Sequence, residues 1–308
     1  IASKNDHENA VAGLNHPAGV LRPDDFIKIK ANWEPKDRNL LQIAEELNLM
    51  PDSMVFVDDN PAEREIVRAQ VPGAAVPEMP AEPAHYAKII DRSGFFEVTG
   101  LSEDDRRRTA MYQENDRRKQ EQAAFADYEE YLKALAMKAE IGPFTAVYMA
   151  RIAQLTNKSN QFNLTTRRYS QPEIEAVAAD PAYITLYGKL EDKFGDNGVI
   201  SVVIGHRQEQ VLHMDLWIMS CRVLKRDMEF AMMDTLAERC MEAGITEIRG
   251  YYYPTAKNAM VKEFYSRQGF DKIEEDAAGN TKWRLVLTEG YEKKNRVIAV
   301  NGCGGQER

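Results

Sequence analysis

The sequence predicts an α/β protein in two parts, a parallel-sheet domain followed by a mixed α/β domain, on three observations. Over residues 1–100, short apolar runs alternate with amphipathic segments, the order that produces a parallel sheet with helices on its faces. Residues 102–138 contain no Gly or Pro and carry mixed charge, which is typical of solvated helices. Residues 139–290 place three consecutive strand-like runs before a helix and a strand–helix–strand order.

We therefore divide the 308 residues into a first domain (1–100), a helical connector (101–138), a second domain (139–290) and a tail (291–308). The net charge of −9 disfavours nucleic acid and anionic membranes as partners. No apolar run approaches the ~20 residues that a membrane span needs. Three cysteines are too few and too scattered for a disulfide scaffold or a zinc site, so we expect a cytoplasmic protein.

The elements of the first domain follow from local patterns. Residues 37–49 (DRNLLQIAEELNL) carry one apolar helical stripe, and residues 53–57 (SMVFV) indicate a short buried strand. A helix is expected over 61–71, because Pro61 suits its first position. Residues 74–76 (AAV) then indicate another strand. This order predicts a parallel sheet.

The second domain combines a strand meander with later helices. Turn signals separate its first three strands, and Gly residues end its two later helices. The strands are predicted at 183–193, 198–207, 211–220, 246–254 and 281–287, and the helices at 227–243 and 257–268.

Four polar residues of the first domain suggest a phosphate and Mg²⁺ site. Ser3 leads into a helix, Lys36 begins another, and Asp58 and Asp59 end the strand at 53–57. In an open parallel sheet, ligands bind beyond the carboxyl ends of the strands. A hydroxyl and helix N–H groups bind phosphate, an ammonium neutralises it, and carboxylates hold Mg²⁺.

The stretches SKND, NWEPK and VFVDDNPAERE resemble three motifs of the haloacid dehalogenase (HAD) superfamily, subfamily IIIC. More narrowly, the chain resembles the FkbH-like family, in which a HAD-type domain is joined to a GNAT acyltransferase-like domain. The resemblance implies that Ser3 binds phosphate and that Lys36 stabilises nucleophile and phosphate. It also implies that Asp58 and Asp59 support the metal, with Asp59 in the catalytic set.

One departure from the HAD pattern concerns the nucleophile. The family's DxD strand is expected before residue 1, so the first domain is expected to be truncated and to perform no phosphotransfer alone. An alternative is that Asp58 and Asp59 form a strand-end turn that caps the next helix, with Lys36 on the surface and Ser3 as another cap.

A second constellation lies at residues 219–233 (MSCRVLKRDMEFAMM), where a strand turns into a helix. The turn exposes backbone N–H groups at a helix N-terminus, and Arg222, Lys225 and Arg226 add positive charge. The segment resembles the GNAT loop that binds coenzyme A or phosphopantetheine, of pattern [QR]-x-x-G-x-[GA]. Arg222 is kept, but Lys225 and Asp227 replace both glycines, and their side chains would crowd an approaching phosphate.

Further candidates surround this loop. Cys221 could carry a thioester, or be a small buried hydrophobe. The segment NKSNQFN resembles a family segment and could line a substrate pocket, or form a polar turn. Its candidate ligand-binding residues are Asn157, Asn160, Gln161 and Asn163. His206 and His213 fall on adjacent strands without a third metal ligand, so a satisfied strand histidine is favoured over a base.

The resemblance implies a HAD-type phosphatase and acyl (glyceryl) transferase. Such an enzyme takes a small phosphorylated three-carbon acyl donor and loads the acyl group onto an acyl-carrier-protein thiol. Mg²⁺ is the implied cofactor, with acyl-CoA or phosphopantetheine as a second. Two alternatives are an acyl-CoA-dependent GNAT acyltransferase with a degenerate HAD domain, and a non-catalytic module whose basic turn docks an acidic carrier protein.

Overall fold

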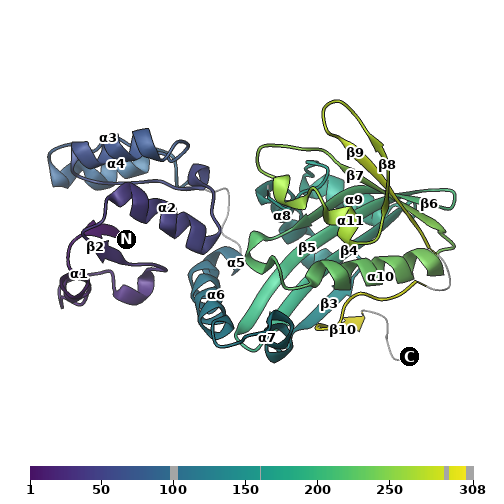
Figure 1. Ribbon diagram of the computed structural model, residues 1–308. Coiled ribbons are helices and arrows are strands. Elements are labelled where there is room, and N and C mark those ends of the chain that lie inside the picture. The colour runs from purple at the N-terminus through teal and green to yellow at the C-terminus, as the bar shows by residue number, and fades with distance from the viewer. Residues whose placement is uncertain (98–102, 160, 288–290, 303–308) are drawn as a thin grey trace. The chain divides into compact units, whose positions relative to one another are not determined.

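The computed structural model of the chain describes residues 1–97, 103–159, 161–287 and 291–302. It divides into two compact units, Ile1–Gln113 and Glu114–Arg308. Unit 1 holds a two-stranded parallel sheet and unit 2 an eight-stranded mixed sheet (Figure 1), which confirms the predicted α/β class. Each helix in the described part of the chain is too short or too polar to span a lipid bilayer.

Unit 1 alternates short strands and helices. Strand β1 (Ala2–Lys4) pairs in parallel with β2 (Lys30–Asn32), and α1 (His7–Leu14) lies between them in sequence. The predicted strands at 53–57 and 74–76 are reduced to one parallel bridge between Val55 and Ala75. The remaining helices of this unit are α2 (Lys36–Leu47), α3 (Pro61–Gln70), α4 (Tyr86–Arg92) and α5 (Glu103–Arg106), with single 3₁₀ turns at Pro23–Asp25, Pro51–Ser53 and Pro83–His85.

The core of unit 1 is small. Leu40 of α2 and Val67 of α3 pack with Phe56 and Val71. Helix α2 ends at Asn48, whose left-handed backbone (φ 54°) terminates the helix, and α3 begins after Asn60, whose side chain accepts a hydrogen bond from the backbone of the second helical residue. These two helix ends therefore fix the segment that carries Asp58 and Asp59.

Unit 2 is built on a sheet with strand order β10-β3-β4-β5-β6-β7-β9-β8. Neighbouring strands are antiparallel except for the parallel pairs β10/β3 and β6/β7. The strands are β3 (Lys138–Gly142), β4 (Tyr183–Asp192), β5 (Gly195–Gln208), β6 (Val211–Met219), β7 (Glu247–Tyr252), β8 (Asp271–Glu275), β9 (Thr281–Val286) and β10 (Ala299–Gly302).

Helices cover both faces of this sheet. Helix α10 (Met228–Glu242) packs on one face, and α8 (Met149–Lys158) and α9 (Gln171–Ala179) pack on the other (Figure 1). The side chains of β4 alternate accordingly, because Leu186 lies in the α10 cluster and Tyr187 in the α8 cluster. Each strand of the centre therefore contributes to two cores.

Strands β6 and β7 pair over three residue pairs only. Beyond this point the chain itself fills the space between them. The backbone N–H of Leu164 donates to the Trp217 carbonyl, and that of Met219 donates to the Phe162 carbonyl, each at 3.2 Å. On the other side, the N–H of Tyr253 donates to the Leu164 carbonyl at 2.9 Å. The segment that follows α8 thus acts as a short extra strand.

The domain boundaries differ from those predicted. The division between the units falls inside α6 (Arg108–Gln122), and the predicted solvated connector is partly built into unit 2. Arg118 of α6 is 2% exposed and pairs with Asp192 at 2.7 Å, and α7 (Tyr128–Ala134) buries Tyr131. The sequence could not reveal this burial. A charged helix with one buried arginine has the same polar pattern as a helix that is exposed on all sides.

The prediction of a tail over 291–308 is wrong for residues 291–302. The Tyr291 hydroxyl donates to Asp234 of α10 at 2.9 Å, and the Asn295 N–H donates to the same carboxylate at 2.8 Å. Strand β10 then pairs with β3. The rest of the predicted tail lies outside the described residues. Backbone and side-chain hydrogen bonds hold residues 291–302 in place. The polar composition of this segment gave no sign of these bonds.

Replacing Gly250 by Ala is expected to destabilise unit 2. Gly250 of β7 pairs with Trp283, and a Cβ added to it would lie 2.4 Å from Cε1 of Tyr265, a fully buried residue of α11 (Phe264–Arg267). Because the ring is packed on all sides, we expect the free energy of unfolding to fall by about 1–3 kcal/mol, measured by urea denaturation.

Gly13→Ala in α1 is the matched control, because nothing lies within 4 Å of a Cβ at that position. There we expect a change between zero and a gain of about 1 kcal/mol. An unchanged urea midpoint for Gly250→Ala would contradict the close packing of Tyr265 against β7.

Candidate functional site

The first candidate site lies where residues 54–57 end in unit 1. Lys36, the first residue of α2, places its Nζ 2.6 Å from Oδ2 of Asp58. The Asp58 side chain is 5% exposed, and its Oδ1 accepts a hydrogen bond from the backbone N–H of Asn60 at 3.0 Å. The carboxylate of Asp58 is therefore neutralised and fully engaged within the chain.

Arg64 of α3 orders the two aspartates. Its Nη1 donates to the carbonyl oxygens of both Asp58 and Asp59, each at 2.9 Å, and the side chain is buried. The Asp59 side chain is exposed and has no recorded partner in the part of the chain that the structure describes. Sequence reasoning missed Arg64. Its place one helical turn before the buried Val67 is the signal that could have identified it.

These residues could supply one carboxylate ligand to a Mg²⁺ ion. Asp59 offers an exposed carboxylate, whereas Asp58 is held by Lys36. Mg²⁺ commonly binds through one or two carboxylates and keeps several waters. Among the described residues there is no group of three or more His, Cys, Asp or Glu side chains that could hold a metal ion. Of the predicted pair, Asp59 is thus the residue whose carboxylate is exposed and could reach a metal ion.

Ser3 lies on β1 opposite Ala31 and is half-buried. The next residue, Lys4, forms an ion pair with Glu63 in the first turn of α3, at 2.5 Å. Because Glu63 follows Asp59 closely in sequence, this ion pair holds the end of β1 beside the start of α3. The structure therefore brings the strand of Ser3 and the turn of Asp59 to one edge of the unit.

The second candidate site is a cavity of about 340 Å³ in unit 2. It is bounded by the end of β6, the loop 220–227, the first turn of α10 and residues 260–268. Its walls are mostly apolar, and the side chains that form them are Phe162, Met219, Leu224, Phe230, Met260 and Phe264.

Two polar side chains that line this cavity have buried atoms without hydrogen-bond partners. Oε2 of Glu229 and both amide atoms of Gln268 are buried and unpaired, and Gln268 is 1% exposed. Burial raises the pKa of Glu229, and the negative charge of Asp227 adds to this effect. Two exposed cations, Lys225 and Arg267, also line the cavity. Sequence reasoning missed Glu229 and Gln268, because an acidic residue in a first turn and a Gln before a helix-ending Gly are ordinary helix-terminus patterns.

The loop before α10 keeps the backbone shape of a glycine pattern. Lys225 and Asp227, the residues that stand where the resembled loop has Gly, adopt left-handed backbones with φ of 64° and 60°. Such conformations are uncommon for residues other than Gly and persist only where surrounding contacts impose them. The loop therefore retains the geometry of the pattern while it carries two charged side chains.

Arg226 does not face the cavity. It is 7% exposed, and its Nη1 lies 3.1 Å from Oδ2 of Asp192, while its Nη2 donates to Asn115 and to the Arg222 carbonyl. Burial, with the nearby charge of Arg118, lowers the pKa of Arg226 to about 10. Of the three predicted basic residues, Arg226 is thus a structural anchor, and Lys225 is the one that reaches the cavity.

The amides of NKSNQFN mainly hold a turn. Nδ2 of Asn157 donates to the Ala153 and Tyr169 carbonyls at 2.9 Å, and Oδ1 of Asn163 accepts from the N–H of Thr166. Oε1 of Gln161 is buried and unpaired, and Asn160 lies outside the described residues. Among the described residues of this segment, the apolar Phe162 lines the cavity.

Cys221 and His213 lie apart from the cavity lining. Cys221 is half-buried in the 3₁₀ turn Cys221–Val223, and its thiol is not part of a disulfide among the described residues. Nδ1 of His213 lies 2.7 Å from the Tyr251 hydroxyl, and burial lowers the pKa of this histidine. His206 faces His213 across the β5/β6 pair. The hydrogen bond to Tyr251 satisfies His213, as the sequence favoured.

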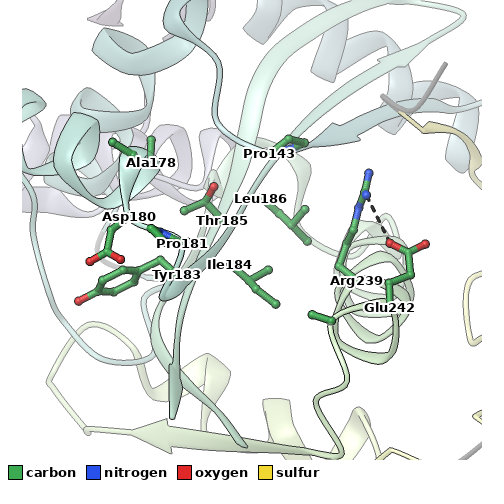
Figure 2. A pocket seen from close by; sticks show the side chains of 12 residues that line it. Pro143, Ala178, Asp180, Pro181, Tyr183, Ile184, Thr185, Leu186, Arg239 and Glu242 are labelled. Atoms are coloured by element: carbon green, nitrogen blue, oxygen red, sulfur yellow. Dashed lines mark hydrogen bonds and ion pairs between the residues drawn. The ribbon is translucent and has the colours of Figure 1, made fainter. Parts of the chain in front are cut away.

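A second pocket of about 500 Å³ lies between β4 and the end of α10 (Figure 2). Ile184 and Leu186 point into it from the strand, and Arg239 pairs with Glu242 on the helix at 3.4 Å. Its remaining charged residue, Asp180, accepts a hydrogen bond from the N–H of Ala182. Since these charged groups have partners within the chain, they do not need hydrogen bonds from a ligand, in contrast to the unpaired atoms of Glu229 and Gln268 in the first cavity.

No family model and no curated protein matches this chain. Among solved structures, the N-terminal part of a Bacteroides fragilis protein, which contains a phosphatase domain and is complexed with Mg, is 42% identical over 32% of this chain and 27% of its own, with a TM-score of 0.31. This chain thus spans about a quarter of that structure. The narrower FkbH-like assignment stays a prediction.

Acetyltransferase structures match about half of the chain. One, an acetyltransferase of the GNAT family from Streptococcus pneumoniae, is 12% identical over 49% of this chain and 100% of its own, with a TM-score of 0.39. Another, the PaiA N-acetyltransferase from Thermoplasma acidophilum in complex with coenzyme A, is 14% identical over 48% and 99%, with a TM-score of 0.37.

Lys36→Met is expected to destabilise unit 1. The substitution leaves the buried Asp58 carboxylate without its ammonium partner, and breaking a buried pair in this way costs about 3–5 kcal/mol. The double variant Lys36→Met/Asp58→Asn should recover a large part of this loss, because the remaining charge is removed. Urea unfolding of the set gives the coupling energy.

Arg38→Ala is the control for this cycle, because Arg38 pairs with Glu34 at 3.8 Å with both side chains exposed. We expect it to change the unfolding free energy by about 0.5 kcal/mol or less. A loss of similar size for Lys36→Met would show that the Lys36–Asp58 pair contributes no more than a surface pair.

Glu229→Gln is expected to stabilise unit 2 at high pH. Burial raises the pKa of Glu229 in the folded state, so the folded protein binds this proton more tightly than the unfolded chain. Stability is therefore lost as the pH rises above the unfolded pKa of about 4.5. The variant should raise Tm at pH 8 and leave it nearly unchanged at pH 4, as measured by thermal denaturation.

Glu275→Gln serves as the control of opposite sign. Hydrogen bonding to Lys272 lowers the pKa of Glu275, so its contribution to stability is present above the unfolded pKa and is lost on acidification. We expect no gain in Tm at pH 8 for this variant. A Glu229→Gln variant without a gain at pH 8 would refute an unpaired buried carboxylate at residue 229.

Proposed function

We propose that the chain is part of a HAD-type phosphatase and acyl (glyceryl) transferase. In this proposal, unit 1 handles the phosphate of a small three-carbon acyl donor, and unit 2 holds the phosphopantetheine arm of an acyl carrier protein whose thiol receives the acyl group. The observation that carries the proposal is the 340 Å³ cavity beside the N-terminus of α10, with Lys225 and Asp227 in left-handed backbones.

The cavity suits an arm that is anionic at one end and neutral along its length. The first turn of α10 has backbone N–H groups that lack helical partners, and Lys225 adds a cation there. Beyond the position where the anionic end would bind, the apolar walls remove hydrocarbon from water. They also protect a thioester from hydrolysis by excluding water. A volume of about 340 Å³ is within the range of small-molecule sites.

Asp227 weakens the same site. Its carboxylate stands at the N-cap of α10 and has a pKa raised by burial and by Glu129. An anion that approaches the helix N-terminus meets this negative charge. We infer that the loop binds the single phosphate of a carrier-protein arm through Lys225, and that the rest of the affinity comes from the carrier protein and the apolar walls.

In unit 1, this chain's residues bind and orient a phosphate. The Ser3 hydroxyl and the N–H groups at the start of a helix donate to phosphate oxygens, and Lys36, held at the site by Asp58, neutralises charge. Asp59 would hold Mg²⁺, which when bound neutralises phosphate charge. The Asp nucleophile that the HAD resemblance implies is part of the proposal for the whole protein.

The docking-module alternative loses part of its support. It relied on a basic turn of Arg222, Lys225 and Arg226, and Arg226 is buried against Asp192. Arg222 is half-buried, and its Nε donates to the Ser220 hydroxyl at 3.3 Å. Among Arg222, Lys225 and Arg226, Lys225 is therefore the exposed cation, which is a small surface charge for an acidic partner.

Titration of the chain with coenzyme A by calorimetry tests arm binding in unit 2. We expect binding at or below millimolar concentration. Lys225→Ala should weaken it several-fold because a phosphate contact is lost, and Asp227→Gly should strengthen it because a repelling carboxylate is replaced by the residue that a left-handed backbone favours.

Lys272→Ala is the matched control, because Lys272 of β8 pairs with Glu275 and does not line the cavity. Its affinity for coenzyme A should equal that of the parent chain. Absence of binding at millimolar coenzyme A, or an equal loss in the Lys225 and Lys272 variants, would overturn the proposed arm site.

A further inference from the structure

The cavity in unit 2 contains an unexplained polar end. Oε2 of Glu229 and both amide atoms of Gln268 are buried there without hydrogen-bond partners, although the surrounding walls are apolar. Most buried polar side-chain atoms in folded proteins are paired. Two residues in one cavity that both break this rule indicate a ligand that completes their hydrogen bonds.

The chemistry of the two side chains defines the missing group. An ionised carboxylate only accepts hydrogen bonds, whereas an amide both donates and accepts. A hydroxyl is a group of the matching kind, because it can both donate to a carboxylate oxygen and accept from an amide N–H. A hydrocarbon would leave both side chains unpaired, and a ligand carboxylate or phosphate would be repelled by Glu229.

The charges around the cavity give the ligand a direction. Lys225 and Arg267 are exposed, whereas Glu229 and Gln268 are buried. The anionic end of a ligand is therefore favoured outside and its neutral, hydroxyl-bearing end inside. In the proposed function the ligand is an acylated phosphopantetheine arm. Its phosphate would then lie at the outer end of the cavity and its acyl group at the inner end.

We propose that Glu229 and Gln268 are specificity-determining residues that select an acyl group carrying a hydroxyl over a hydrocarbon acyl group of the same length. This inference rests on the proposed function, which places the acyl-bearing arm in the cavity. Sites built to hydrogen-bond a hydroxyl strongly reject the analogue that lacks it, because their polar groups then stay unpaired. We expect at least about tenfold discrimination from the two partners together.

The test compares lactyl-CoA with propionyl-CoA, which have the same carbon skeleton and differ by one hydroxyl. Calorimetry with the full chain should give a Kd for lactyl-CoA at least about tenfold below that for propionyl-CoA. Gln268→Met removes the amide at similar volume, so this ratio should fall while the Kd for propionyl-CoA changes little, and the remaining Glu229 should keep part of the discrimination. Glu229→Gln keeps an acceptor and should retain part of the ratio.

Gln210→Met is the control, because Gln210 is exposed and does not line the cavity. It should leave the ratio unchanged, and a thermal melt of each variant checks that it folds. The ratio measured on the parent chain tests the proposal even if a variant fails to fold.

The outcomes separate the inference from the function beneath it. Equal binding of the two thioesters by the parent chain overturns the inference and leaves arm binding intact. A ratio that Gln268→Met leaves unchanged also overturns the role of Gln268. Binding of neither thioester nor coenzyme A overturns the proposed function, and the inference with it.

Discussion

The buried carboxylate of Asp192 is the interaction on which the site in unit 2 depends. Its side chain is fully buried at the end of β4, and Arg118 of α6 binds both of its oxygens at 2.7 Å while Arg226 binds Oδ2 at 3.1 Å. Charges this deep are tolerated only when paired and hydrogen-bonded. Three segments that are distant in sequence must therefore meet at this point, and one of them is the loop that leads into α10.

Anchoring that loop has a consequence for the cavity. Because Arg226 is fixed, its neighbours Lys225 and Asp227 are held in left-handed backbones that they would not adopt freely. This conformation turns Lys225 toward the cavity, and the helix that follows buries Glu229 in its first turn. The strained loop and the unpaired carboxylate thus both result from the anchoring of Arg226. Both features lower the folding stability, which is common where residues are arranged for binding.

Unit 1 uses the same principle on a smaller scale. Of the two adjacent aspartates, Asp58 is buried against Lys36 and Asp59 is left exposed, with Arg64 holding both carbonyl groups. Adjacent residues at the end of an extended segment point to opposite sides, so one carboxylate is structural while the other faces solvent. The pair that looks equivalent in the sequence therefore divides into an anchor and a candidate metal ligand.

The sequence by itself determined the α/β class, the order of most elements and the positions of the two candidate turns, because hydrophobic periodicity and turn residues are local signals. It also predicted Lys36, Asp59 and Lys225 as site residues, which stay predictions. Only the tertiary structure decided that Arg226 and Arg118 are buried, that Ala299–Gly302 joins the sheet as β10, and that Glu229 and Gln268 share one cavity. Burial and partner choice depend on segments far apart in the chain, so no local pattern encodes which charge stays exposed and which polar group is left for a ligand.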